Sequence, residues 1–576
     1  MPAPRPRGVT YRYNIALGPQ NAGVNPTAAR PAADSATCLQ DFEPLLPAEA
    51  LVMRAAASGG IAKIGYRRPR SAAPDLRLRA EFLAFLLRGG SADAPVAGRR
   101  LQILGACIVG CLDLRDASVP VSLWMYRCVF GTTPVLDGAH VRGSMAFPDS
   151  ALPGFAAEGC RINGELAFNA GCSLHGELQL TRAVIGRDLN CERLQLHESE
   201  KFTPGRPCRV VADGMSVAGD LVLAGAEAVG ELHLRAARVG GELRATGARL
   251  SAPFDPTGAR GVALNLDCVE VRGNVRLDRG FTAAGQVRAQ RARIDGDLDC
   301  SSAGFDAAGD AGWDDARTVL LDGARIGGAL ILRELQAPLQ GASLVDATVG
   351  SLADDVATWG QHHVLDGFSY RRVGAHAPTD AATRLGWLDR QHASQLGSDF
   401  RPDPWRRLIG VLRGMGHGRS AAAVAIGRER HLRRAGLIGR DLPAWLRWLP
   451  RVGHDLFGLF AGYGHRPLRV LGIATLLWLA CGAAYWAAAA DGAMAPSGRV
   501  AAAPFVPLAY SLDVLVPLLD LGQARRWAPA VGGRSNVALM VLGLSWFEAL
   551  CGWLAALTLL VGTTGLADRD WRERSA

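Results

Sequence analysis

The chain has 576 residues, too many for one hydrophobic core, so at least two domains are expected. Its 69 glycines argue against a wholly helical body, and its net charge of +9 comes almost wholly from arginine, since Lys63 and Lys201 are the only lysines. The 12 cysteines form no CxxC pair, so we expect small buried side chains in a reducing compartment rather than a paired metal or redox motif.

The basic excess is concentrated before the first long apolar run. The arginines concerned are Arg428, Arg430, Arg433, Arg434, Arg440, Arg447 and Arg451. A basic segment can bind nucleic acid or anionic lipid. No motif interleaves aromatic and basic residues for base stacking, so we expect membrane lipids and no nucleic acid as partners.

Residues 1–40 are rich in Pro, Ala and Arg without periodicity, which predicts a disordered leader. This segment has no apolar core of a signal peptide, so we expect the body of the chain to stay in the cytoplasm. Residues 41–98 contain helical patterns at 47–53 and 78–87 and are expected to form a helical cap on the domain that follows.

Residues 99–352 repeat the phrase A-x-[V/I]-x-G-x-L-x-L about every 11 residues. Copies include Ala237–Leu243, Val271–Leu277, Ala292–Leu298 and Ala324–Leu330. The alternation points every second side chain to one face, and such short strands bury that face only by stacking. We therefore predict a mainly β fold, a right-handed β-solenoid built from units of about 11 residues, two of which make about 22. Interruptions at 199–208, 252–262 and 302–318 are expected to be loops.

The stretches Gly273–Val287 and Arg293–Cys300 resemble a family of bacterial membrane proteins related to pentapeptide-repeat solenoids. The resemblance covers residue 41 to the C-terminus, and members of that family often carry the label "membrane-associated oxidoreductase". It implies a bacterial inner-membrane protein and, by that label alone, a redox activity. True A-[D/N]-L-x-x pentapeptide runs are absent, which leaves the coil cross-section open.

Residues 353–465 are expected to form a helical connector, with helices near 381–388 and 405–412. Its last part mixes large apolar residues with Arg447 and Arg451, which is typical of a helix in the lipid headgroup layer. The apolar residues are Trp445, Leu446, Trp448, Leu449, Leu456, Phe457, Leu459 and Phe460.

Residues 466–576 are predicted to be a membrane module with spans at 468–490 and 537–566. Arginines before the first span and after the second favour cytoplasmic termini and a cytoplasmic solenoid. Between the spans, residues 505–523 form an apolar half-helix and turn that is too short to cross a bilayer.

This order of elements resembles the module of two-helix potassium channels. Ser511 stands near the start of the pore-helix equivalent, Gly522 at the end of the filter equivalent, and Glu548 at the start of the inner-helix equivalent. A potassium filter needs several glycines, whereas this stretch has one, with Pro517 before it and Asp520 within it. Potassium selectivity is therefore not expected, but a less selective pore and a module for homo-oligomerisation both remain open.

Three carboxylates near membrane depth are candidate functional residues. Glu548 is either a functional intramembrane group or an interfacial residue at the beginning of its helix. Asp513 and Asp520 either line a pore in an oligomer or are solvated in an external loop.

No dinucleotide-binding, phosphate-binding or nucleophile motif is present, and Gly414–Gly418 follows a helical pattern at the wrong spacing. His362 and His363 are expected in a solvated loop, so we predict no catalytic residue, cofactor or metal. Four solenoid carboxylates follow the outward period and are expected to be solvated, namely Glu177, Glu231, Glu242 and Asp297.

Three functions remain open at this point. The favoured one is a non-enzymatic membrane scaffold or sensor that presents the solenoid to an unknown cytoplasmic protein. The second is an oligomeric pore gated by the solenoid, and the third is an enzyme with an unrecognised site.

Overall fold

The computed structural model describes residues 38–197, 210–252, 261–306, 317–397, 400–463, 467–497, 504–530 and 536–564. The chain divides into two units, Met1–Thr379 with Gly386–His392, and Asp380–Leu385 with Ala393–Ala576. Nearly all of the predicted leader and most of the three predicted loops lie outside the described residues.

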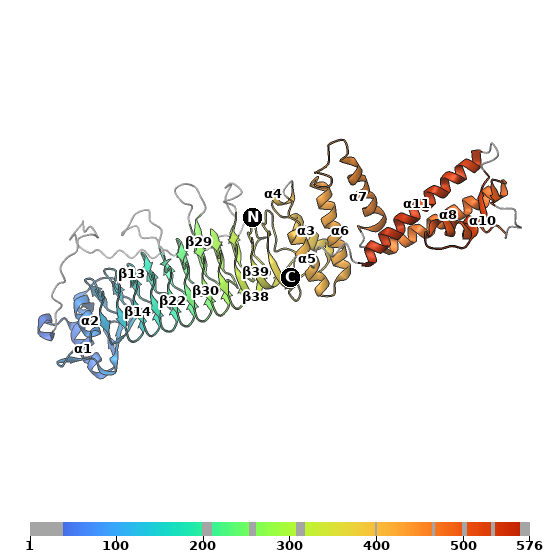
Figure 1. Ribbon diagram of the computed structural model, residues 1–576. Helices are drawn as coiled ribbons and strands as arrows, with labels where there is room; N and C mark the ends of the chain where they lie inside the picture. The colour runs from blue at the N-terminus through green and yellow to red at the C-terminus, as the bar shows by residue number, and fades with distance from the viewer. Residues whose placement is uncertain are drawn as a thin grey trace, which may run out of the picture. The chain divides into compact units, whose positions relative to one another are not determined.

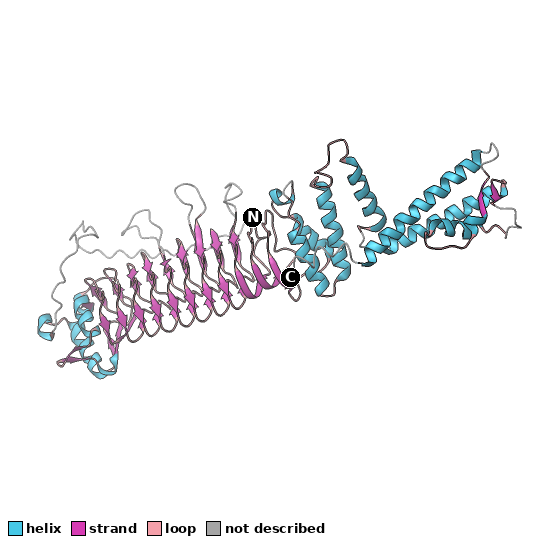
Figure 2. Ribbon diagram, viewed as in Figure 1, coloured by secondary structure: helices cyan, strands magenta, loops and turns pink. Residues whose placement is uncertain are grey.

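The first unit is a stack of parallel strands that form a 21-stranded, a ten-stranded and a seven-stranded sheet (Figures 1 and 2). One coil consists of β10 (His140–Val141), β11 (Met145–Ala146), β12 (Ala151–Leu152) and β13 (Phe155–Ala156). His140 pairs with Arg161 and Arg161 with Val184, so a coil takes 21 or 23 residues. The predicted β-solenoid is confirmed, and the strand pairing shows that each coil contains two of the repeat units, which the sequence had left open.

The repeated glycine of each coil is required by the closeness of the next one. The amide of Gly296 donates to the carbonyl of Gly273, and a Cβ added at Gly296 would lie 2.8 Å from that carbonyl oxygen. A Cβ at Gly273 would lie 2.7 Å from the carbonyl oxygen of Gly241. A side chain at these positions would therefore push the coils apart.

Three coils are longer, and each carries its insertion at the same corner. The chain leaves after β20 (Gln195–Leu196), β28 (Arg249–Ser251) and β36 (Gly304–Asp306), all strands of the ten-stranded sheet. It returns at β21 (Val210–Val211), β29 (Val262–Asn265) and β37 (Val319–Leu320) in the seven-stranded sheet. The strands β29 and β36 include residues of the second and third predicted loops, so these loops are shorter than expected.

The N-terminal cap contains α1 (Pro47–Ser58) and α2 (Ala80–Leu87), close to the predicted helices. It also contributes strands, because β1 (Ile61–Lys63) pairs with β5 (Arg100–Leu104) and β2 (Arg77–Arg79) pairs with β6 (Cys107–Val109). These strands cover the backbone of the first coil, which would otherwise be an open edge.

At the other end the strands run beyond residue 352, where the alternation was expected to stop. The strand β39 (Thr348–Asp354) pairs with β40 (Ser369–Val373), and His363 forms a bridge with Gln391. The sequence signal fades there because the Gly-x-Leu phrase is lost while the backbone ladder continues.

The second unit is helical. Its connector contains α5 (Asp403–Gly414), α6 (Gly418–Arg434) and α7 (Trp448–Ala461), and the predicted helix at 381–388 is α3 (Ala381–Asp389). Its C-terminal part contains α8 (Pro467–Ala490), α9 (Pro507–Leu515), α10 (Gln523–Arg526) and α11 (Asn536–Thr564). A short antiparallel pair, β41 (Met494–Pro496) with β42 (Trp527–Pro529), links the segments that flank α9.

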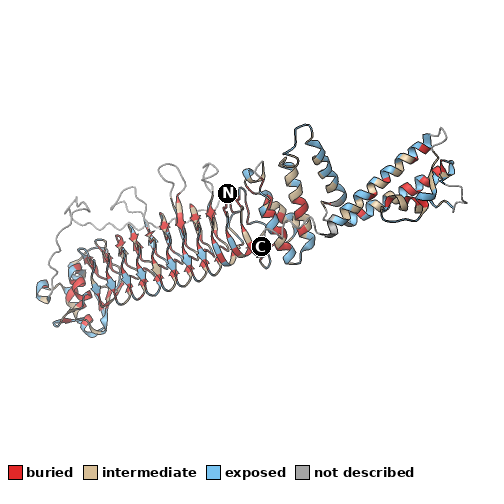
Figure 3. Cartoon of the chain, viewed as in Figure 1, coloured by how far each residue is buried: buried red, intermediate tan, exposed pale blue. Residues whose placement is uncertain are grey.

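Two helices, over Leu468–Ala490 and Asn536–Leu560, are long and apolar enough to cross a membrane. Their apolar side chains mostly face outward (Figure 3), as shown by Leu468, Leu476 and Met540, which are 80%, 68% and 74% exposed. A helix in the core of a soluble protein would bury such side chains, so these faces need a covering.

Candidate functional site

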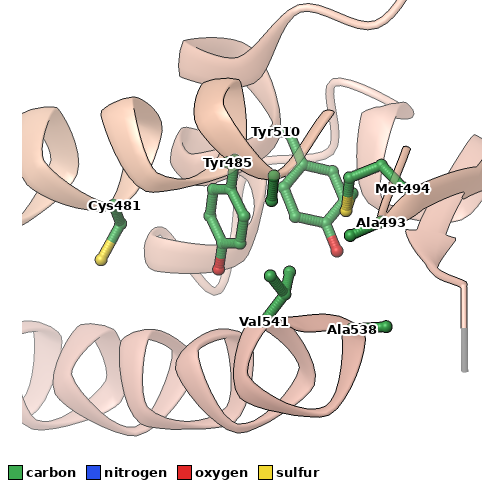
Figure 4. Packing of buried hydrophobic residues seen from close by; sticks show 8 residues of the cluster. Cys481, Tyr485, Ala493, Met494, Tyr510, Ala538 and Val541 are labelled. Carbon is green, nitrogen blue, oxygen red and sulfur yellow. The ribbon is translucent and has the colours of Figure 1, made fainter. Parts of the chain in front are cut away.

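The half-helix α9 packs against both α8 and α11. Tyr485 of α8 and Tyr510 of α9 lie side by side above Val541 of α11, with ring centroids 4.8 Å apart (Figure 4). The buried cluster also contains Cys481, Ala488, Ala493, Met494 and Ala538.

Two glycines allow this close approach. A Cβ added at Gly552 of α11 would lie 1.7 Å from the backbone oxygen of Leu515, the last residue of α9. A Cβ at Gly482 of α8 would lie 2.6 Å from the side chain of Leu508, near the start of α9. Small residues in apolar runs are a known signal of helix contacts, but the sequence interpretation did not use it.

Glu548 is fully buried within this packing. The hydroxyl of Tyr485 donates to its Oε2 across 2.7 Å, and the hydroxyl of Ser511 is hydrogen-bonded to its Oε1. Because α11 begins at Asn536, the alternative that Glu548 opens its helix is wrong. It stands at the middle of the apolar segment Asn536–Leu560.

The Ser511 hydroxyl has one hydrogen but faces two oxygens, Glu548 Oε1 and the carbonyl of Trp478 at 3.1 Å. When Glu548 is protonated, its carboxyl group can donate a hydrogen bond to Ser511 Oγ while the Ser511 hydroxyl donates to the carbonyl of Trp478. Both contacts are then hydrogen bonds at the same time. An ionised carboxylate here would have no cationic partner among the described residues, which is expensive in a buried apolar site. The site therefore accommodates Glu548 best when its carboxyl group is protonated.

Asp513 does not join this cluster. Its two carboxylate oxygens accept from the amides of Leu521 and Ala524 at 2.7 and 2.8 Å, which holds the turn after α9. Gly522, with φ of +72°, precedes α10 in that turn.

Asp520 lies in the same turn and is exposed. It accepts from the amide of Gly522 at 3.0 Å and pairs with Arg525 at 2.8 Å. The structure thus brings Ser511 and Glu548 together, and keeps Asp513, Asp520 and Gly522 in a separate polar turn. Sequence reasoning missed Tyr485, because a tyrosine in an apolar helix gives no sign of its partner.

The solenoid surface also carries a hollow. It is a groove of about 860 Å³ that crosses β20, β24 (Glu227–Val229), β28, β32 (Thr282–Ala284) and β36. Apolar and polar side chains line it, including Val229, Ala284 and Ala337, and the ion pair of Glu227 with Arg249 at 2.7 Å.

The prediction that four solenoid carboxylates are merely solvated holds for Glu177 but not for the others. Asp297 Oδ1 accepts the amide of Ala329 at 2.6 Å, in the next coil. Glu231 bonds to His233 at 2.8 Å.

Glu242 bonds to Asn274 at 2.9 Å and to Arg244 at 3.2 Å. Partial burial raises the pKa of Glu242, but these hydrogen bonds outweigh it and leave the pKa below its usual value. Glu242 and Asp297 thus tie one coil to the next, a role that period alone cannot reveal.

The expectation of a solvated His362–His363 loop is right for exposed His362 and wrong for His363. His363 is fully buried, its Nε2 lies 3.1 Å from the carbonyl of Gly360, and its ring lies against Trp359. Within the described ranges, no group of three or more His, Cys, Asp or Glu side chains could hold a metal ion.

The cysteines of the solenoid interior behave as expected of small core residues. Cys128, Cys160 and Cys191 are buried, and burial raises the pKa of each thiol to about 12. These thiols are therefore poor nucleophiles at neutral pH.

No family model, curated protein or solved structure matches this chain. The resemblances to pentapeptide-repeat membrane proteins, to their oxidoreductase label and to potassium channels therefore stay predictions.

Proposed function

We propose that this chain is a scaffold of the bacterial inner membrane, anchored by α8 and α11, which presents its solenoid to a protein partner in the cytoplasm. The outward apolar side chains of both helices support the anchor. The arginines before α8 support cytoplasmic placement of the solenoid, because cytoplasmic flanks of spans are enriched in Arg.

The groove on the ten-stranded sheet is the observation that best supports a scaffold function. Successive strands there stand about 4.8 Å apart in register, so the groove presents a row of side chains at regular intervals, such as Glu227, Arg249 and Thr282. Val229 is 40% exposed within it, which gives an apolar contact between charged edges. Such a groove suits an extended segment of a partner protein.

Photocrosslinking in intact cells tests this proposal. A benzophenone amino acid replaces Val229 in the groove or Val184 on the 21-stranded sheet, which is exposed to a similar degree, 40% and 38%. We expect one discrete adduct from position 229 and none from position 184. Equal labelling from both positions, or none from 229, would contradict a groove-bound partner.

Membrane anchoring is tested separately by alkaline carbonate extraction of cell membranes. An anchored chain stays in the pellet and dissolves only with detergent. Release by carbonate alone would show that α8 and α11 do not cross the bilayer.

A second candidate function is an oligomeric pore, favoured by the packing of α9 between two possible spans around buried Glu548. Against a potassium-type filter, the stretch Leu519–Gly522 has a single glycine and contains Asp520, with Pro517 just before it. Purified protein in liposomes should pass ions, and Asp520→Ala or Glu548→Ala should abolish the flux. A monomer in native mass spectrometry, or no flux at any voltage, would exclude the pore.

A further inference from the structure

An amphipathic helix of a soluble protein packs its apolar face on its neighbours. The helix α7 instead packs polar side chains on α6. Asp455 of α7 pairs with Arg433 of α6 through two hydrogen bonds of 3.0 and 2.9 Å. His454 lies 3.3 Å from Glu429, one turn earlier on α6. These contacts fix the rotation of α7 about its own axis.

The outward face of α7 and of the turn before it is apolar. Its exposed residues are Trp445, Trp448, Leu449, Val452, Leu456, Leu459 and Phe460, from 44% to 73% exposed. They recur at three and four residues, so they form one continuous stripe. A stripe of this length in water would be unfavourable, so something apolar covers it.

The chain itself places α7 beside a bilayer. Only five residues separate the end of α7 at Ala461 from the start of α8 at Pro467. A connection of this length reaches at most about 20 Å. If α8 crosses the membrane, as proposed above, the C-terminal end of α7 cannot leave the membrane surface.

The charge around the stripe fits an anionic surface. Residues 428–463 contain seven arginines against three carboxylates. Arg430, Arg434, Arg440 and Arg447 are exposed. A guanidinium group can donate two parallel hydrogen bonds to the oxygens of one phosphate. Trp side chains prefer the boundary between lipid headgroups and acyl chains.

We propose that α7 lies in the headgroup layer of an anionic bilayer, with its apolar stripe among the acyl chains and the neighbouring arginines on lipid phosphates. The pairs Asp455–Arg433 and His454–Glu429 hold α6 on the water side of α7. This inference rests on the proposed membrane anchor, and it adds a second, peripheral contact that would fix the height of the connector above the bilayer.

The test uses the full chain in nanodiscs with a benzophenone amino acid at one of three positions. Leu456 lies in the stripe and is 48% exposed, and Leu476 lies in α8 and is 68% exposed. Arg419 is exposed near the start of α6, about 15 Å along that helix from Glu429. Adducts are identified by mass spectrometry as lipid or protein.

We expect lipid adducts from positions 456 and 476 and none from 419. A lipid adduct at 476 combined with a protein–protein adduct, or no adduct, at 456 would overturn the inference and leave the anchor intact. No lipid adduct at 476 would overturn the anchor itself, and with it the inference.

The preference of α7 for anionic lipid is tested by changing the lipid composition of the nanodiscs. Nanodiscs of phosphatidylglycerol should give several-fold more adduct at 456 than nanodiscs of phosphatidylcholine, and the difference should shrink in Arg440→Gln/Arg447→Gln. Equal yields in both lipids would overturn phosphate recognition. Adduct formation at 476 is the control, because it should not depend on the headgroup.

Discussion

The phenol of Tyr485 on α8 donates to the carboxyl group of Glu548 on α11 across 2.7 Å, and both side chains are fully buried. Ser511 of α9 bonds to the other carboxyl oxygen. One side chain thus joins three helices that are separated in sequence.

Tyr485→Phe should destabilise the C-terminal module by about 1–3 kcal/mol, because it leaves a buried carboxyl oxygen without its donor. Glu548→Gln should have a smaller effect, since an amide can still accept one hydrogen bond and donate another. Thermal unfolding in detergent, followed by tryptophan fluorescence, measures both.

Tyr510→Phe is the matched control for Tyr485→Phe. Tyr510 is also buried and touches Tyr485, but its hydroxyl makes no hydrogen bond within the described part of the chain. Equal losses in the two variants would show that the bond to Glu548 contributes nothing.

Gly552→Ala should displace α9, because the new Cβ would overlap the backbone oxygen of Leu515, 1.7 Å away. Backbone cannot move aside as a flexible side chain can, so we expect a loss of about 1–3 kcal/mol or more. Gly543→Ala in the same helix meets no atom within 4 Å and should be harmless. Hydrogen exchange at 507–515 reports the difference, and similar exchange in both variants would contradict close packing of α9 on Gly552.

Asp297→Leu should weaken the solenoid by about 1–2 kcal/mol, because the amide of Ala329 loses its acceptor. Asp297→Asn should be nearly neutral, because Asn274 stands at the equivalent place in the preceding coil and accepts the amide of Asp297 at 2.9 Å. Urea unfolding followed by circular dichroism distinguishes them. If Asp297→Asn destabilised the solenoid as much as Asp297→Leu, the hydrogen bond between the coils would not be the source of the stabilisation.

His363 should make the solenoid less stable in acid. Burial, aided by nearby Arg390 and His362, lowers its pKa to about 4 from the ordinary histidine value of 6.5. The unfolded chain therefore binds the proton more readily, so the stabilisation is complete above pH 6.5 and is lost as the pH falls towards 4.

This loss amounts to at most about 3 kcal/mol, from 1.36 kcal/mol for each pKa unit. Unfolding free energies between pH 4 and 7.5 measure it, and His363→Gln should flatten that part of the profile. An unchanged slope in this variant would assign the acid sensitivity to other groups.

The sequence alone determined the solenoid and the two apolar helices, because both depend on periods along the chain. An alternation repeated every 11 residues can bury its inner face only by stacking, and an apolar run of more than 20 residues can form only a long helix with apolar sides. The half-helix at α9 followed from the same counting.

Only the tertiary structure decided which side chains meet. It paired Glu548 with Tyr485 rather than with Asp513 or Asp520, buried His363 but not its neighbour His362, and turned the polar face of α7 onto α6. The physical reason is that hydrogen bonds and ion pairs act over about 3 Å between atoms that lie far apart in the chain. Their formation depends on the crossing of helices and the register of coils, which no local period encodes.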